Sequence, residues 1–359
     1  MAQTIDKMIE ECVQEMYGRI QKGKKPRLKI PKRTLSNVIY DTKKEYLKLN
    51  GSETTRTLNY NIIKSFVQTI FMLRLCKELA ETNEKASKRE LYYIFYGYGD
   101  AAFSDQGSSD QILDDVESMF AVTREMLGVY PEERGGAVSG NLIVVDKNKK
   151  GKKIEIDCGN FGSGAYSIPV YVENLKFKTD AKFMLVVETA GLFQRLSNNE
   201  FAQENDCIMV TTGGMPTRAS RRFIRRLSDD KKMDVYVLND SDPWGFTIYR
   251  VLKVGSASSA HVNDHLSVPR ASFLGVTPDD IKKYDLPTHP LGEKGRKKIK
   301  DMLETDPFVK RHKPWQKALQ KMEEMNVRCE QQSFAKYGLN HVIDKYLPEK
   351  LSDTKSFLP

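Results

Sequence analysis

Apolar residues at helical spacing predict two long helices in the first part of the chain. In residues 4–22 they recur every three or four positions, which is typical of an amphipathic helix. Residues 62–80 show the same period. A basic connector and an extended piece at residues 36–41 lie between them. The first helix is expected to dock either on its own core or on another polypeptide.

The next stretch predicts two further helices and then a β-hairpin. Ser87 and Glu90 have the spacing of a capping box, so a helix should begin at Lys88. Residues 110–127 carry another helical pattern, with Gly128 as its expected stop.

The hairpin is expected from two strand-like runs, at residues 141–146 and 153–158, joined by a lysine-rich turn. A hairpin that follows three helices is typical of a winged-helix domain, whose wing contacts DNA. The candidate contacts at its tip are Lys149, Lys150 and Lys152. A solvated turn with no DNA contact is the alternative interpretation.

The second half of the chain alternates short apolar runs with helical stretches. Residues 181–188, 206–212 and 234–240 are nearly continuous apolar runs, as expected of strands buried on both faces of a parallel sheet. This βαβα order predicts an α/β domain. The expected fold class is therefore mixed α/β, with a winged-helix (CAP-like) domain followed by a Rossmann-like parallel-sheet domain.

Three regions are expected on this basis. Residues 1–61 form an N-terminal arm that contacts a partner, residues 62–160 the winged-helix domain, and residues 161–359 the parallel-sheet domain with its C-terminal helices.

Composition narrows the class of protein. Lys and Arg exceed Asp and Glu by nine in 359 residues, which favours a polyanionic partner such as nucleic acid. No apolar run approaches the roughly 18 residues of a membrane helix. The five cysteines are scattered and never form a CxxC pair, which argues for a reducing compartment. We expect a cytoplasmic, nucleoid-associated protein that does not bind membranes.

Carboxylates follow two of the predicted parallel strands. Glu188 ends one strand, and Asp240 and Asp242 follow another. Ligands of open α/β sheets gather beyond the carboxyl ends of the strands. Mg²⁺ takes oxygen ligands and is usually held by one or two carboxylates together with substrate phosphates. The sequence therefore predicts a magnesium site, and solvated acids that cap helices are the alternative.

Arginines recur on one face of the helix expected after residue 217. The candidate phosphate contacts at this spacing are Arg218, Arg221, Arg222 and Arg225. The guanidinium fork suits a phosphate better than a lysine does. A solvated basic helix is the competing interpretation.

Tyrosines crowd the helix that begins at Lys88. Arg89 and Tyr93 are four residues apart and share a face, whereas Tyr92 lies about 100° away and should point toward the core. A phenol with a pKa near 10 is a poor nucleophile at neutral pH and needs a neighbouring cation. Arg89 is placed to supply it. Tyr96 and Tyr98 lie where the helix should end, and a surface or DNA-stacking role suits them better.

These motifs together are similar to one family. The stretches KRELYY, LVVE, NDSDPWGFTIYRVLKVGS, FLGVTPDDI and YLPEK occur in order along essentially the whole chain. With them the chain resembles the A subunits of the type IIB DNA topoisomerases, the topoisomerase VI family that also includes the meiotic double-strand-break protein.

The resemblance implies an activity, a metal and partners. Tyr93 would attack a DNA phosphodiester and become joined to the 5′ end, with Arg89 as the helper arginine. Glu188, Asp240 and Asp242 would bind Mg²⁺ in a Toprim domain. Two A subunits would form a homodimer on double-stranded DNA, each cutting one strand. A separate topoisomerase VI B subunit would complete an A2B2 heterotetramer and use ATP, for which this chain has no GxxxxGK[ST] motif.

Two departures from the family pattern leave alternatives open. Thr189 and Ala190 follow the glutamate where relatives show a lysine and an acid. Gly213 and Thr217 stand where relatives tend to show Lys and Asp. A divergent paralogue that cuts DNA without the B subunit, a Toprim nuclease that uses water, and a non-catalytic DNA-binding protein are the competing interpretations.

Overall fold

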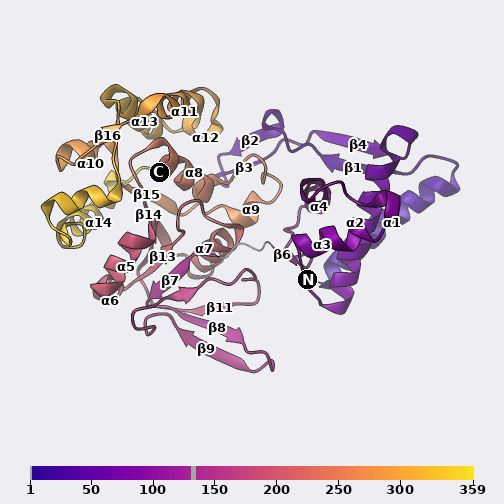
Figure 1. Cartoon of the computed structure of the whole chain (residues 1–359), viewed down its shortest axis with the longest axis horizontal. Helices are drawn as coiled ribbons and strands as arrows, with labels where there is room; N and C mark the ends of the chain where they lie inside the picture. Colours follow the sequence, from indigo (N-terminus) through magenta and orange to yellow (C-terminus); the bar gives the residue numbers. More distant parts are fainter. Residues whose placement is uncertain (1, 131–134) are drawn as a thin grey trace. The chain divides into compact units, whose positions relative to one another are not determined.

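The computed structural model describes residues 2–130 and 135–359, which fall into two compact units (Figure 1). The helical unit comprises residues 2–39, 47–130 and 256–265. The sheet unit comprises residues 40–46, 135–255 and 266–359. Each unit has its own buried core, and each is described separately.

Four helices build the helical unit. They are α1 (Ala2–Gln21), α2 (Ile63–Thr82), α3 (Lys88–Tyr96) and α4 (Gln106–Phe120). Two pairs of short strands accompany them: β1 (Arg27–Pro31) with β4 (Glu53–Thr57), and β5 (Ala86–Ser87) with β6 (Val129–Tyr130). The extended piece predicted at residues 36–41 contains β2 (Val38–Asp41), which pairs with β3 (Tyr46–Leu49). The short helix α9 (Asn263–Leu266) begins in residues 256–265.

The predicted helices of this unit are confirmed, with one change of bounds. The core joins apolar side chains of α1 to α4, among them Ile5, Leu73, Leu91 and Leu113. The helix expected at residues 110–127 instead starts at Gln106, capped by Asp105, and ends at Phe120. Ala121 then adopts the left-handed conformation, with φ of 50°, which terminates the helix before Gly128.

The sheet unit is built on a sheet of six strands in the order β10-β7-β13-β12-β14-β15. Its strands are β7 (Ala137–Gly140), β10 (Tyr166–Ser167), β12 (Phe183–Val187), β13 (Cys207–Thr211), β14 (Asp234–Leu238) and β15 (Ala271–Gly275). The four from β13 to β15 in this order are parallel, and β7 and β10 continue the sheet antiparallel. The predicted parallel sheet is confirmed.

Helices cover both faces of the parallel strands. They are α5 (Ala190–Asn198), α6 (Phe201–Glu204), α7 (Arg218–Lys231) and α8 (Pro243–Val254). Figure 1 shows α5 and α6 on one side of β13 and β7, with α7 on the other. Leu185 and Val187 of β12 join the core under α5, while the alternate residues Met184 and Val186 are also buried. Burial on both faces explains why the strands read as continuous apolar runs.

Further helices complete the unit after β15. They are α10 (Pro278–Lys283), α11 (Gly292–Thr305), α12 (Pro307–Arg311), α13 (Lys313–Met325) and α14 (Leu347–Ser352). Two short strands, β16 (His289–Pro290) and β17 (Val327–Arg328), pair with each other, and a 3-10 helix spans Gln331–Tyr337. None of the helices in residues 2–130 and 135–359 is long and apolar enough to cross a membrane.

The lysine-tipped hairpin forms as predicted but belongs to the sheet unit. Strands β8 (Ile143–Lys147) and β9 (Lys153–Asp157) pair antiparallel, and β11 (Lys176–Lys178) adds a third strand along β8. Both hairpin strands fall in the compact unit that contains the Rossmann-like sheet. The hairpin therefore lies outside the compact unit that holds α2, α3 and α4, and its role as a DNA-contacting wing stays a prediction.

Candidate functional site

The capping box fixes where α3 begins and therefore which tyrosine is exposed. Ser87 Oγ accepts a hydrogen bond from the Glu90 N–H at 3.2 Å, and Glu90 Oε2 accepts one from the Ser87 N–H at 2.6 Å. This confirms the predicted helix start at Lys88. Leu91 and Phe95 turn into the core, and Tyr93 is left 57% exposed.

The other tyrosines of the cluster differ in environment. Tyr92 packs, half-buried, against the helical core, as predicted, and its ring meets that of Tyr93 edge-on at 5.4 Å. Tyr98 stacks on Phe71 with ring centroids 4.7 Å apart. Tyr96, at the last position of α3, is 67% exposed. Tyr98 is also 36% exposed but lies beyond the end of α3, so among the tyrosines of α3 itself exposure leaves Tyr93 and Tyr96 as accessible phenols.

A cation distinguishes Tyr93 from Tyr96. Arg89 lies one helical turn before Tyr93 and is exposed. Within the described residues its guanidinium has neither a hydrogen bond nor an ion pair. The positions one turn before Tyr96 are held by Tyr92 and Tyr93, so no cation precedes it. Tyr93 is the exposed phenol with a positive charge on its own face of the helix.

The parallel sheet brings Glu188 and Asp240 to the same edge. Strands β12 and β14 are direct neighbours, with Val187 opposite Leu238. Glu188 follows β12 at once, and Asp240 lies two residues beyond β14. Glu188 Oε2 accepts a hydrogen bond from the Asp240 N–H at 3.1 Å. The prediction that these acids share the carboxyl edge of the sheet is confirmed.

The third acid is held by the start of α8. Asp242 caps this helix, and its Oδ1 accepts a hydrogen bond from the Gly245 N–H at 2.6 Å. Gly245 lies so close to the preceding turn that a Cβ there would meet the Asp240 carbonyl oxygen at 2.3 Å. The turn that carries the Asp-x-Asp-Pro-x-Gly motif therefore requires glycine at its last position. Helix capping uses one carboxylate oxygen of Asp242.

Burial and nearby negative charges raise the pKa values of all three acids. Burial raises the pKa of Glu188 to about 7, the charges of Asp240 and Asp242 add to the rise, and the Asp240 N–H opposes it. Burial is also the main reason that the pKa values of Asp240 and Asp242 are raised. A cation bound at this edge would relieve both effects.

The acids fit a hydrated cation better than an all-protein cage. Within the described residues, no three His, Cys, Asp or Glu side chains are grouped so as to hold a metal by themselves. Each acid instead turns one oxygen to a backbone N–H. Mg²⁺ keeps several waters and takes only one or two carboxylates with substrate phosphates, so this oxygen-donor set suits it.

One segment of the site was missed by sequence reasoning. Ser241 pairs with Cys329 through two backbone hydrogen bonds of 2.8 and 3.1 Å. This pairing lets the Gln331 N–H donate to Asp240 Oδ1 at 2.9 Å. Charged residues of the same segment also act on the acids. Arg328 lowers the pKa of Asp242, whereas Glu330 raises the pKa values of Asp240 and Asp242. These residues lie some 90 positions from Asp240, and no sequence pattern links the two stretches.

The loop after β13 accommodates the residues that depart from the family pattern. Gly213 and Gly214 have φ of 63° and 99°, a conformation that favours glycine. The Gly214 N–H donates to the Glu188 carbonyl at 3.0 Å. Thr217 caps α7 by accepting from the Ser220 N–H at 3.2 Å. Threonine thus performs the capping that an aspartate at this position would also perform.

The structure corrects the predicted arginine face of α7. Arg221 and Arg222 are 4% and 6% exposed. Arg222 pairs with the buried Glu173, Arg221 Nε donates to the Leu266 carbonyl, and Arg225 Nη1 donates to the Ser267 carbonyl at 2.7 Å. Arg218 is half-buried and also has an interaction partner. These side chains hold the sheet unit together and do not form an open surface for phosphates.

The hairpin tip, in contrast, is open. Lys149, Lys150 and Lys152 are exposed, and the turn is held by Asn148, whose Oδ1 accepts the N–H groups of Lys150 and Lys152 at 3.0 Å each. The lysine ammonium groups are therefore presented to solvent by an ordered turn.

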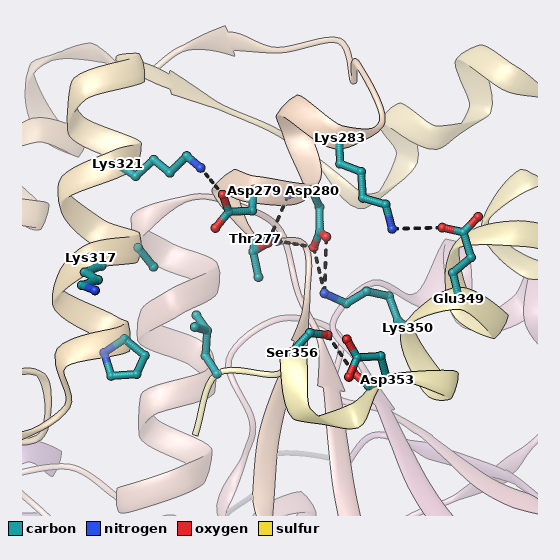
Figure 2. A pocket seen from close by; sticks show the side chains of 13 residues that line it. Thr277, Asp279, Asp280, Lys283, Lys317, Lys321, Glu349, Lys350, Asp353 and Ser356 are labelled. Carbon is teal, nitrogen blue, oxygen red and sulfur yellow. Dashed lines mark hydrogen bonds and ion pairs between the residues drawn. The ribbon is translucent and has the colours of Figure 1, made fainter.

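A pocket of about 630 Å³ lies elsewhere in the sheet unit, between α10, α13 and α14 (Figure 2). Several lysines line it, but most of them form ion pairs with carboxylates of the same pocket. Lys321 pairs with Asp279, Lys283 with Glu349 at 3.1 Å, and Lys350 with Asp280 at 3.3 Å. This internal pairing gives the pocket no marked preference for an anion.

Comparison with known proteins places the whole chain in one family. Residues 64–129 match the family described as type IIB DNA topoisomerase, and residues 132–181 match the all-beta domain of the DNA topoisomerase VI alpha subunit. Residues 183–351 match the Toprim domain shared by Spo11 and the topoisomerase 6 A subunit. The hairpin falls within the all-beta match.

Curated relatives cover nearly the full chain. The A subunit of type 2 DNA topoisomerase 6 from Methanocaldococcus jannaschii is 46% identical over 98% of this chain and 95% of the relative. This chain belongs to the family of topoisomerase 6 A subunits. The A subunits of Methanothermobacter thermautotrophicus and Archaeoglobus fulgidus are 40% and 37% identical, over 92% and 95% of this chain and the same shares of their own lengths. The resemblance identified from the motifs is confirmed, and the Toprim domain of this family contains the three acids.

Arg222→Ala is expected to destabilise the protein rather than to weaken DNA binding specifically. Removing one partner of a buried ion pair costs about 3–5 kcal/mol, because the charge of Glu173 is left uncompensated. Chemical denaturation measures this loss. As a control, Lys149→Ala should change stability by less than about 0.5 kcal/mol. A stable Arg222→Ala protein with reduced DNA affinity would contradict the structural role.

Divalent-cation affinity is expected to fall as the pH drops through about 7, where Glu188 takes up a proton. Below that pH the loss should approach about tenfold per pH unit. Without a cation, stability should change with pH in the opposite direction. The pKa of Glu188 is higher in the folded protein than in the unfolded chain, so its contribution to the free energy of unfolding declines as the pH rises toward 7. Calorimetric Mg²⁺ titrations on either side of neutrality test this. Equal affinities, or an unchanged pH dependence in Glu188→Gln, would refute it.

Proposed function

We propose that this chain is the DNA-cleaving and religating A subunit of a type IIB topoisomerase. The observation that carries the proposal is the exposed Tyr93 with Arg89 one turn before it, unpaired within the described residues, in a chain of the topoisomerase 6 family. A phenol that reacts with a DNA phosphate must be reachable and must have positive charge beside it. Among the tyrosines of α3, Tyr93 meets both conditions.

The reaction is a reversible transesterification. Tyr93 Oη attacks the phosphorus, its P–O bond forms, and the bond from phosphorus to the DNA 3′ oxygen breaks. The phenol proton leaves to solvent, and the 3′ oxygen leaves as a hydroxyl after taking a proton. The DNA 5′ end stays joined to Tyr93, so the phosphodiester energy is conserved and the 3′ hydroxyl can reverse the step. Arg89 stabilises negative charge on the attacked phosphate.

Glu188, Asp240 and Asp242 would hold Mg²⁺. The ion would supply positive charge for the phosphate and for the leaving 3′ oxygen. The carboxylates themselves bind and orient: the backbone bonds to Asp240, Gln331 and Gly245 fix one oxygen of each acid and leave its other oxygen for the cation or its waters.

The remaining parts of the proposal concern partners. Each chain offers one Tyr93, so a double-strand break requires a homodimer, and a second duplex passes through that break. The relatives are named as A subunits, which supports a partner B subunit that uses ATP in an A2B2 complex. Residues 1–22 are the proposed partner contact, and Lys149, Lys150 and Lys152 the proposed DNA contacts. Such a complex would work on the nucleoid in the cytoplasm.

Tyr93→Phe is expected to abolish covalent protein–DNA complexes while leaving DNA affinity near that of the wild type, because it removes only the nucleophilic oxygen. Denaturing gels of cleavage reactions with the purified B subunit, ATP, Mg²⁺ and supercoiled DNA measure the complexes. Tyr96→Phe is the matched control on the same helix and should retain them.

Two outcomes would overturn the assignment. Covalent complexes that persist in Tyr93→Phe and vanish in Tyr92→Phe or Tyr96→Phe would move the nucleophile to another phenol. Free DNA ends without attached protein in the wild type would indicate a Toprim nuclease that uses water. Wild-type cleavage without the B subunit would instead favour a stand-alone divergent paralogue.

A further inference from the structure

Buried polar atoms without partners occur on residues that adjoin the three acids in sequence or through a hydrogen bond. Within residues 2–130 and 135–359, Thr189 Oγ1, Ser241 Oγ and both carboxamide atoms of Gln331 are buried without a hydrogen bond. Thr189 follows Glu188, Ser241 lies between Asp240 and Asp242, and Gln331 is bonded to Asp240 through its backbone. Buried polar atoms are rarely left unpaired, and an ion or ordered water is a usual explanation when they are.

Gln331 stands out among them because it is 1% exposed and contributes two of these atoms. The Ser241–Cys329 backbone pairing and the hydrogen bond from the Gln331 N–H to Asp240 Oδ1 fix the position of this residue. The proximity of the carboxamide lowers the pKa of Asp240, although neither carboxamide atom completes a hydrogen bond within the described residues. The side chain therefore lies beside Asp240 with a donor and an acceptor unused.

We propose that Gln331 is a positioning residue of the cation site, whose carboxamide lies beside Asp240 and accepts a hydrogen bond from a water of the hydrated ion. The inference rests on the Mg²⁺ site proposed above. Mg²⁺ keeps several waters, and such waters are donors that need acceptors around the ion. A carboxamide supplies an acceptor and a donor without adding a fourth negative charge to three acids that already repel one another.

A purely structural role for this side chain predicts the opposite behaviour. If Gln331 stabilised the fold, an apolar side chain of similar length would lower the stability of the cation-free protein. If its polar atoms serve the cation, burying them unpaired is unfavourable without the ion, and methionine should be tolerated or should stabilise. The two roles therefore predict opposite effects of the methionine substitution on the stability of the Mg²⁺-free protein.

The test compares Gln331→Met with Gln332→Met in the full chain. Gln332 is adjacent in sequence, of the same type and exposed, so it is a matched control. Melting temperature is followed across a MgCl2 titration without DNA. Gln331→Met should match or exceed the wild-type melting temperature without Mg²⁺. It should need about 10- to 100-fold more Mg²⁺ for half of the stabilisation, as expected when a group that orients a metal ligand is lost.

The outcomes separate this inference from the proposed function. A wild-type response to Mg²⁺ that Gln331→Met reproduces at the same concentration would overturn the role of Gln331 and leave the metal site standing. A lower melting temperature without Mg²⁺, with an unchanged response, would assign it to the fold. If the wild type does not respond to Mg²⁺ while Ca²⁺ and Mn²⁺ also fail, the metal site itself is refuted and the inference falls with it.

Discussion

Three acidic side chains held half-buried at one edge of a parallel sheet are the constraint on which the candidate metal site depends. The β12–β14 pairing brings Glu188 beside Asp240, and the close approach of Gly245 tightens the turn that carries Asp242. This arrangement raises the pKa of each acid and is unfavourable by itself. The strands beneath it, buried on both faces, supply the apolar packing that offsets the repulsion. A bound cation would offset this repulsion.

The helical unit solves a different problem with local interactions. The proposed nucleophile has to be exposed on a rigid element, and the capping box on α3 meets this requirement by fixing which face of the helix carries Tyr93. Leu91 and Phe95 then anchor one face, so that Arg89 and Tyr93 occupy the other. The basic residues discussed above fall into two groups according to their burial. Arg221 and Arg222 of α7 are buried and partnered within the sheet unit, whereas the hairpin lysines are exposed to solvent.

Features set by neighbours in sequence could be predicted, and features set by distant partners could not. The start of α3, the exposure of Tyr93 and the partial burial of Tyr92 follow from residues within two helical turns. The shared edge of Glu188 and Asp240 follows from the topology of parallel strands. The hairpin follows from its own pattern of residues, but its pairing with β11 is not visible in that pattern.

The burial of the α7 arginines and the position of Gln331 beside Asp240 could not be predicted from the sequence, for the same reason. Spacing shows which side chains share a face, but only the buried Glu173 shows that Arg222 turns inward. Gln331 meets Asp240 through a backbone bridge between segments far apart in the chain. Its signal, a buried carboxamide without partners among the described residues, exists only in three dimensions.

The central claim is that Tyr93 becomes covalently joined to DNA. Mass spectrometry of the trapped complex, after digestion of the DNA and the protein, tests it most directly. A nucleotide attached through its 5′ phosphate to the peptide that contains Tyr93, with fragment ions that place it on that residue, is the predicted result. Attachment to Tyr92, Tyr96 or Tyr98, or a 3′ phosphate linkage, would contradict the account.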